Sequence, residues 1–170
     1  MKKLNKKGFT LIELLAVIVI LAVVLGIAIP AVSKYITQSR KNGYVDNLLQ
    51  FIDAARKGAT LGDEFELPVD EGSKTVITFE QLESSLEKGG KTSPYGNPWN
   101  LNNSFVVIQN TGSSDLPKYT YYVTATDGKY ATGTSGESKA EIIAENDLKA
   151  SHVVRMDGGG LDPKNFEMPD

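Results

Sequence analysis

An unbroken apolar run from Leu14 to Val32 constrains this chain more than any other feature. A helix needs about 20 such residues to cross the hydrocarbon core of a bilayer, so the run is long enough to span a membrane. Four lysines lie within the first seven residues, and a basic cluster ahead of such a helix keeps its amino terminus on the cytoplasmic side. The sequence therefore predicts a single-pass membrane helix near its start.

One carboxylate, Glu13, lies at the beginning of this apolar segment. A charge inside a bilayer costs at least about 2.5 kcal/mol unless it finds a partner, so Glu13 is a functional-site candidate. Phe9 lies four residues earlier, which places it on the same face of a helix. The simpler alternative is a carboxylate that only reaches toward the membrane surface.

A secretory signal peptide is the first alternative for the whole segment, because it also combines a basic start with an apolar core. That core is usually about 7–15 residues long and is followed by a cleavage site of small residues. Here the run is longer, no Ala-x-Ala site follows Val32, and the break between charged and apolar residues is Gly8-Phe9. A cut at this break would leave the apolar helix on the mature protein.

The basic leader, the sequence from Gly8 to Leu14 (GFTLIEL) and the long apolar segment together resemble the type IV pilins and the related pseudopilins. The resemblance is strong over residues 1–58 and concerns only the architecture beyond them. It implies that a membrane prepilin peptidase cuts after Gly8 and methylates the new amine of Phe9. It also implies that Glu13 meets the N-terminal amine of a neighbouring subunit during assembly.

The resemblance also implies an α+β fold in which a long N-terminal helix packs on a small antiparallel sheet, the ladle or lollipop shape of pilins. Residues 1–8 would be the leader and residues 9–32 the transmembrane and filament-core helix. Residues 33–58 would form an amphipathic helix. Residues 59–170 would form the globular head, with a flexible tail over 157–170.

The helix beyond Pro30 has apolar residues at helical spacing between charged ones, which predicts one packed face and an end at Gly58. The apolar positions are Tyr35, Ile36, Tyr44, Val45, Leu48, Leu49, Ile52 and Ala55. Gly26 and Pro30 form a weak point, because Pro30 cannot donate a hydrogen bond to the Gly26 carbonyl. A kink is one interpretation. The resemblance to pilins suggests a second interpretation, in which this stretch of the helix unwinds inside the filament.

The remaining sequence predicts an antiparallel sheet of three or four strands with one short helix. The helix begins at a capping-box signature formed by Thr78 and Gln81. Residues 140–148 fit a helix or a strand, and a helix is favoured. The expected strands are 75–77, 104–109, 119–124, 129–132 (after an Asp127-Gly128 turn) and 151–156.

Residues 94–99 (PYGNPW) form a turn-rich loop with two prolines and a glycine. The loop resembles one in the major pseudopilins, with Tyr and Trp exchanged. Its aromatic side chains are expected to anchor it to the core. A recognition loop that displays Trp99 is the alternative.

No catalytic, cofactor or metal site is expected. The chain has no P-loop, HExxH or Gly-x-Ser-x-Gly motif, and without cysteine it cannot use thiol chemistry or Cys-ligated zinc. The single histidine, His152, lies in a predicted strand and is expected to be a solvated or hydrogen-bonded side chain and not a catalyst. Asp157 and Asp162 could hold calcium, as in secretion-class pseudopilins, but no EF-hand spacing is present.

Charge is unevenly distributed along the chain. Residues 1–58 contain nine basic and three acidic residues, whereas residues 59–170 contain nine basic and eighteen acidic ones. An acidic exported part disfavours general nucleic-acid binding, which depends on basic surfaces.

The sequence therefore predicts a major pilin that forms a helical homo-oligomer on the cell surface after waiting in the cytoplasmic membrane. The resemblance implies a prepilin peptidase, an assembly platform with its ATPase, and minor pilins as partners. A pseudopilin of a type II secretion or competence DNA-uptake system is one alternative. A signal-anchored monomeric enzyme or receptor is another. Adhesion, twitching motility, DNA uptake and biofilm formation are all compatible with the sequence.

Overall fold

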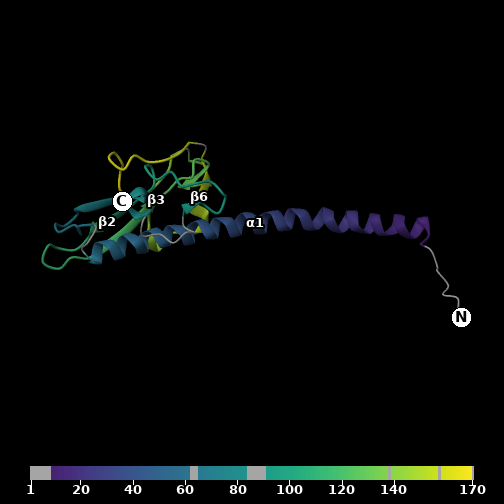
Figure 1. Ribbon diagram of the computed structural model, residues 1–170, viewed down its shortest axis with the longest axis horizontal. Coiled ribbons are helices and arrows are strands. Elements are labelled where there is room, and N and C mark those ends of the chain that lie inside the picture. The colour runs from purple at the N-terminus through teal and green to yellow at the C-terminus, as the bar shows by residue number, and fades with distance from the viewer. Residues whose placement is uncertain (1–8, 62–64, 84–90, 138, 157, 170) are drawn as a thin grey trace. The chain divides into compact units, whose positions relative to one another are not determined.

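The computed structural model describes residues 9–61, 65–83, 91–137, 139–156 and 158–169. The chain forms two compact units, residues 1–38 and 39–170, and helix α1 (Leu11–Leu61) runs through the boundary. Figure 1 shows the order of the elements. They are β1 (Lys74–Thr78), α2 (Phe79–Leu82), β2 (Phe105–Asn110), β3 (Tyr119–Thr124), β4 (Tyr130–Thr132), β5 (Ile143–Ala144), η3 (Glu145–Asp147), η4 (Ala150–His152) and β6 (Val153–Arg155).

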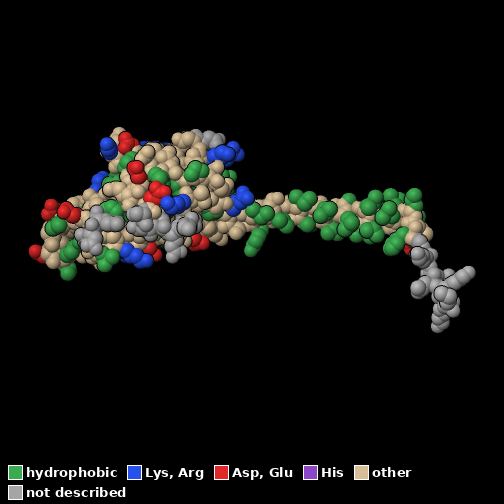
Figure 2. Space-filling view, viewed as in Figure 1, with side chains coloured by type: hydrophobic (Ala, Val, Ile, Leu, Met, Phe, Trp, Pro, Cys, Tyr) green, Lys and Arg blue, Asp and Glu red, His purple; other side chains and the backbone are tan. Residues whose placement is uncertain are grey.

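In the first unit α1 is an uninterrupted helix that continues through Pro30. Its large apolar side chains are exposed from Leu11, which is 85% exposed, to Val32, which is 54% exposed, and Phe9 ahead of the helix is exposed as well. Figure 2 shows hydrophobic side chains along this part of the helix. Among the described residues, α1 is the one helix long and apolar enough to cross a membrane.

In the second unit one face of α1 packs on the sheet. Its buried residues recur at helical spacing and are Tyr44, Leu48, Phe51, Ile52, Ala55 and Ala59. The predicted face is therefore confirmed from Tyr44 onward. Tyr35 and Ile36 do not belong to it, because they are 77% and 46% exposed.

The predicted helix end at Gly58 is wrong, because α1 continues to Leu61. Gly58 keeps a helical backbone and does not adopt the positive φ of a terminating glycine. The extra turn buries Ala59, and the Thr60 hydroxyl donates a 2.7 Å hydrogen bond to the Arg56 carbonyl. Burial of Ala59 thus outweighs the low helix propensity of Gly58.

The main sheet has four antiparallel strands in the order β1-β2-β3-β5. The long central pair is in register from Phe105 opposite Thr124 to Asn110 opposite Tyr119. β1 pairs with the other edge of β2, with Val76 opposite Val107. These β-branched and aromatic strands lie where the sequence predicts them, and the α+β class is confirmed.

Two parts of the predicted sheet differ from the structure. β4 pairs with β6 in a separate two-stranded sheet, although a turn at Gly128 (φ +83°) does connect it to β3 as expected. The helix favoured over residues 140–148 is wrong. This stretch contains β5, which pairs with Tyr122 and Val123, followed by the single turn η3.

The predicted capping box opens α2. The Thr78 hydroxyl accepts a hydrogen bond from the Gln81 amide, and the Gln81 side chain accepts one from the Thr78 amide at 2.9 Å. α2 buries Phe79 and Leu82. Gly89 and Gly90, the expected helix end, lie outside the described residues.

The sheet is covered on both faces. α1 and α2 pack on one face with Trp99 and Val123, and a second cluster on the other face includes Phe105 and Val107. The described part of the predicted flexible tail lies on this second face, where Leu161 is buried and the Phe166 ring lies 5.1 Å from that of Phe105. Flexibility of the tail stays a prediction, and among its described residues Leu161, Phe166 and Met168 pack on the second face.

Removing the Phe51 side chain should destabilise the second unit strongly, because the ring is fully buried and stacks on Phe79 at 3.4 Å between ring centroids. We expect Phe51→Ala to lower the free energy of unfolding by about 3–5 kcal/mol. Denaturant unfolding of the detergent-solubilised chain measures it. The neighbouring exposed residue provides the control, since Gln50→Ala should change this free energy by less than about 0.5 kcal/mol. Equal losses in the two variants would contradict the packing.

Candidate functional site

The candidate site is the N-terminal end of α1, where the sequence places Gly8, Phe9 and Glu13. Gly8 lies outside the described residues. Phe9 precedes the helix, and α1 begins two residues later at Leu11. The first helical hydrogen bond runs from the Leu14 amide to the Thr10 carbonyl at 3.2 Å. Thr10 is therefore the N-cap, and Glu13 is the third residue of the helix.

Thr10 and Glu13 form a reciprocal capping box. The Glu13 carboxylate oxygen Oε2 accepts hydrogen bonds from the Thr10 amide and from the Thr10 hydroxyl, both at 2.8 Å. The Glu13 amide donates to the Thr10 hydroxyl oxygen at 3.3 Å. This arrangement satisfies donors that a helix start leaves unpaired, and it places a carboxylate near the positive end of the helix dipole.

Sequence reasoning missed the role of Thr10, although the signal is present. Thr10-Leu11-Ile12-Glu13 is the Thr-x-x-Glu signature of a capping box. The pattern Thr78-x-x-Gln81 is the same signature, and it predicts the start of α2.

The capping box does not remove the cost of the Glu13 charge in an apolar medium. A cap contributes roughly 0.5–2 kcal/mol, whereas a carboxylate at the centre of a membrane helix costs at least about 2.5 kcal/mol. Within the described residues both bonds to the carboxylate end on Oε2, so Oε1 remains accessible to another donor. Glu13 can therefore take a further, positively charged partner.

The other two sequence-predicted positions of this region, Gly26 and Pro30, lie within the helix. Neither breaks it, and no atom lies within 4 Å of a Cβ built on Gly26. In the single subunit, Gly26 and Pro30 are therefore both helical and exposed. Unwinding of this stretch in a filament stays a prediction.

The comparisons with known proteins agree on this region and on the whole chain. Residues 3–29 match the family model of the prokaryotic N-terminal methylation motif. The type IV major alpha-pilin of Moraxella bovis is 31% identical over 153 residues, which is 90% of this chain and 87% of the relative. The chain belongs to the type IV pilins. No solved structure matches this pilin.

The loop 94–99 of this pilin is anchored in the core. The Trp99 side chain is 4% exposed, and its ring meets that of Tyr44 edge-on with centroids 4.7 Å apart. Tyr95 stacks on Tyr130 with centroids 3.6 Å apart. This placement agrees with the expected anchor and leaves little of Trp99 to display for recognition.

Asp127 joins this loop to the turn between β3 and β4. Its Oδ2 accepts hydrogen bonds from the Ser93 hydroxyl and from the Asn97 side-chain amide. Its Oδ1 accepts from the Lys129 and Tyr130 amides at 3.0 and 2.7 Å. One buried carboxylate thus holds two loops of a chain that has no cysteine to link them.

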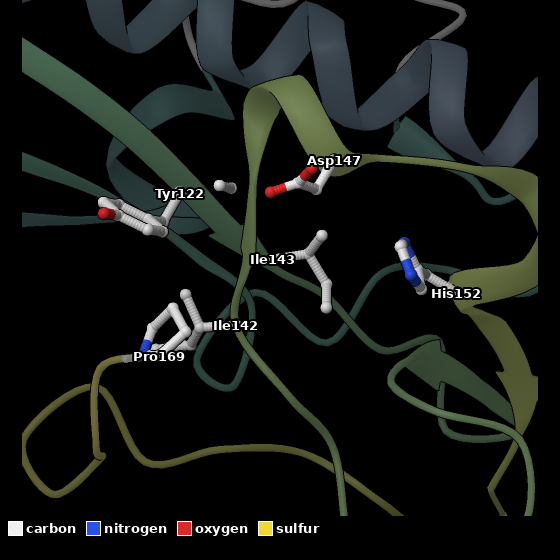
Figure 3. Close-up of a pocket in the computed structure, with 7 residues that line it drawn as sticks. Tyr122, Ile142, Ile143, Asp147, His152 and Pro169 are labelled. Atoms are coloured by element: carbon white, nitrogen blue, oxygen red, sulfur yellow. The ribbon is translucent and has the colours of Figure 1, made fainter.

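The remaining polar candidates do not come together. His152 and Asp147 border a cavity of about 300 Å³ with Tyr122, Ile142, Ile143, Ala144 and Pro169. Figure 3 shows the Asp147 carboxylate turned away from the imidazole. The His152 Nδ1 atom is buried and has no partner among the described residues. Asp162 accepts a hydrogen bond from the Lys164 amide at 2.9 Å, and Asp157 lies outside the described residues.

Loss of the Thr10 hydroxyl should loosen the first turn of the pilin helix. We expect Thr10→Val to weaken this turn by about 1 kcal/mol, which speeds exchange of the Glu13 amide about fivefold. Hydrogen exchange followed by NMR in detergent micelles measures this rate. Thr10→Ser keeps the hydroxyl and should retain the slow exchange. Unchanged protection in Thr10→Val would rule out the capping box.

Alkaline pH should destabilise the second unit through Tyr95. Burial, with a smaller contribution from the nearby Tyr130, raises the pKa of Tyr95 to about 12, above the value of about 10 for an unfolded tyrosine. The unfolded chain therefore releases this proton first. The free energy of unfolding should fall as pH rises between about 10 and 12, and its contribution from Tyr95 should be fully present below about pH 10.

The test compares unfolding midpoints across this pH range in Tyr95→Phe and in the native chain. The Tyr95 hydroxyl has no hydrogen-bond partner among the described residues, so its removal should cost little stability at neutral pH. The variant should show a shallower alkaline loss. Tyr35→Phe, which removes an exposed tyrosine, is the matched control. Identical alkaline curves for Tyr95→Phe and the native chain would contradict the assignment.

Proposed function

We propose that this pilin is the major structural subunit of a type IV pilus and polymerises through α1. The observation that carries the proposal is the exposed apolar surface of residues 9–32, which holds a single carboxylate. An apolar surface of this size requires lipid or other apolar helices around it. Membership in the type IV pilins supports a final state in which other apolar helices surround this surface.

Maturation begins with cleavage after Gly8 and methylation of the Phe9 amine by a prepilin peptidase. Support comes from the match to the N-terminal methylation motif and from the position of Phe9. Phe9, the residue after the proposed cut, lies ahead of the N-cap and outside the helix. Cleavage would convert the Phe9 peptide nitrogen into an ammonium group, which is the partner that Glu13 needs.

Before assembly the subunit waits in the cytoplasmic membrane as a single-pass protein, with residues 9–32 in the bilayer. The leader lysines hold the amino terminus on the cytoplasmic side. After assembly the same residues form the core of a surface filament. The residues that cross the lipid and those that pack in the filament are thus the same, because both environments are apolar.

Assembly pairs the Glu13 carboxylate of one subunit with the Phe9 ammonium of its neighbour. Each charge compensates the other in an apolar core, and the loss of either strands its partner at a cost of roughly 3–5 kcal/mol. Gly26 and Pro30 would allow the packed helices to unwind locally. The chain has no nucleotide-binding motif, so we assign the energy source to a separate ATPase that acts with an assembly platform and minor pilins. We propose no catalytic activity for this pilin.

A pseudopilin of a type II secretion or DNA-uptake system is the second candidate. The PYGNPW sequence of residues 94–99 favours it, since this loop resembles one in major pseudopilins. The relation to a major pilin along 87% of that protein favours the pilus. Filament length separates the two functions, because a pseudopilin would be processed without forming long surface filaments.

The N-terminal mass and sequence of subunits in filaments sheared from the native host test the proposal. We expect a chain that begins at Phe9 and carries one added methyl group. Glu13→Ala should be processed normally but should reduce filament yield at least about tenfold, because it strands the neighbouring ammonium. Glu80→Ala, which removes an exposed carboxylate from α2, is the matched control.

Three results would count against this function. A membrane-bound chain that still begins at Met1 would revive the anchored-monomer alternative. Processed subunits without extended filaments would favour the pseudopilin. Filaments of native yield from Glu13→Ala would leave the Glu13–Phe9 pair without a role.

A further inference from the structure

Exposed apolar residues mark one end of the second unit. Among the described residues after Gln38, three large hydrophobic side chains are exposed, namely Leu61, Val69 and Leu116. Their exposed fractions are 73%, 66% and 79%. Val69 precedes β1, and Leu116 lies in the loop between β2 and β3, so both are at the end of the sheet where β2 finishes with Asn110.

Asn110 fixes the two segments that carry Val69 and Leu116. Its side chain is fully buried, and its Nδ2 atom donates a 2.7 Å hydrogen bond to the Val69 carbonyl. Its Oδ1 atom accepts from the Gly112 and Lys118 amides at 3.0 and 3.1 Å. A buried side chain thus positions two exposed apolar residues, which favours a prearranged contact surface over two unconstrained loops.

Exposed carboxylates lie beside these apolar residues. Asp70 and Glu71 directly follow Val69, and Asp115 directly precedes Leu116. We call this set of five, Val69, Asp70, Glu71, Asp115 and Leu116, the Asn110 surface. Two exposed lysines, Lys74 and Lys118, belong to the same end, and the Lys74 ammonium lies over the Phe166 ring at 4.3 Å. Figure 2 shows acidic side chains gathered at this end of the unit.

The chain contains a segment with the complementary chemistry. Residues 35–41 of α1 carry two exposed apolar residues, Tyr35 and Ile36, followed by two cations, Arg40 and Lys41. Their composition mirrors the Asn110 surface, with an apolar pair and charges of the opposite sign. An apolar centre with complementary charges at its rim is the usual composition of a specific protein interface.

Within the second unit, Arg40 lies far from the Asn110 surface. The Arg40 guanidinium lies over the Tyr95 ring, which stacks on Tyr130. Tyr130 follows the turn after Thr124, and Thr124 pairs with Phe105 at the start of β2. Arg40 is therefore at the Phe105 end of β2, and the Asn110 surface is at the other end, roughly 17 Å away along the strand.

We propose that the Asn110 surface of one subunit binds residues 35–41 of α1 in another copy of this pilin. The proposal rests on the proposed polymerisation and specifies which surfaces meet outside the apolar helix core. Because the two surfaces differ, the contact is head-to-tail and repeats from one copy to the next. A contact of this kind generates an open helical assembly.

Cysteine cross-linking in the full-length pilin tests the contact, because the chain has no cysteine of its own. Tyr35→Cys combined with Leu116→Cys, expressed in the native host, should give a ladder of covalent multimers when sheared filaments are treated with a short bis-maleimide. Each single variant should remain monomeric. Tyr35→Cys combined with Glu137→Cys is the matched control, since Glu137 is exposed in a loop outside both surfaces.

Filaments that form but give no ladder from the test pair would overturn the inference, as would equal ladders from the control pair. If the native chain forms no filaments under any condition, the proposed function fails first and the inference fails with it. The two failures are therefore distinguishable by the presence of filaments.

Charge reversal provides a second measurement that keeps the test decisive if the cysteine pair does not assemble. Asp70→Lys with Glu71→Lys should lower filament yield at least about tenfold, and so should Arg40→Glu with Lys41→Glu, because each places like charges together. All four changes in one chain should restore most of the yield. Glu137→Lys should have no effect. Native yields from both double variants, or no recovery in the fourfold variant, would overturn the proposal.

Discussion

The Glu13 carboxylate is the constraint around which the chain is organised, since it is the one charged side chain in the apolar stretch of residues 9–32. Thr10 supplies two hydrogen bonds to it, but hydrogen bonds from neutral donors do not remove a net charge. In a bilayer the Glu13 charge would therefore remain incompletely satisfied. A second subunit with a free ammonium group can complete the pair. The capping box also orients the carboxylate at the helix start, which makes it available to a partner at the same depth.

Local sequence patterns account for most of the fold. The apolar run, the alternation of charged and apolar residues after Pro30, and the β-branched stretches around Val107 and Tyr121 each determine an element by their own periodicity. The capping box of α2 could be predicted because all of its partners lie within four residues. Gly8, Phe9 and Glu13 are predicted from the same kind of short-range signal, whereas the capping role of Thr10 comes from the structure.

The errors have a common cause, which is that a distant contact decided the local structure. Gly58 continues the helix because Ala59 is buried against the head. Residues 143 and 144 become a strand because β3 offers them a free edge. Tyr35 and Ile36 share the helical spacing of the packed face but lie before the sheet begins to cover it. The residues that make these contacts lie far away in the sequence, so the local pattern does not reveal them.

Buried polar side chains take over the linking role that a disulfide could serve in an exported domain. Asp127 joins the loop 94–99 to the turn before β4, and Asn110 joins the segment before β1 to the loop before β3. Each uses both ends of its polar group, so neither is left unsatisfied in the core. They lie at opposite ends of β2 and fix the loops there without a covalent bond. In the proposed filament such fixed ends would favour a repeated contact, because disorder at the contact would add an entropic cost at every repeat.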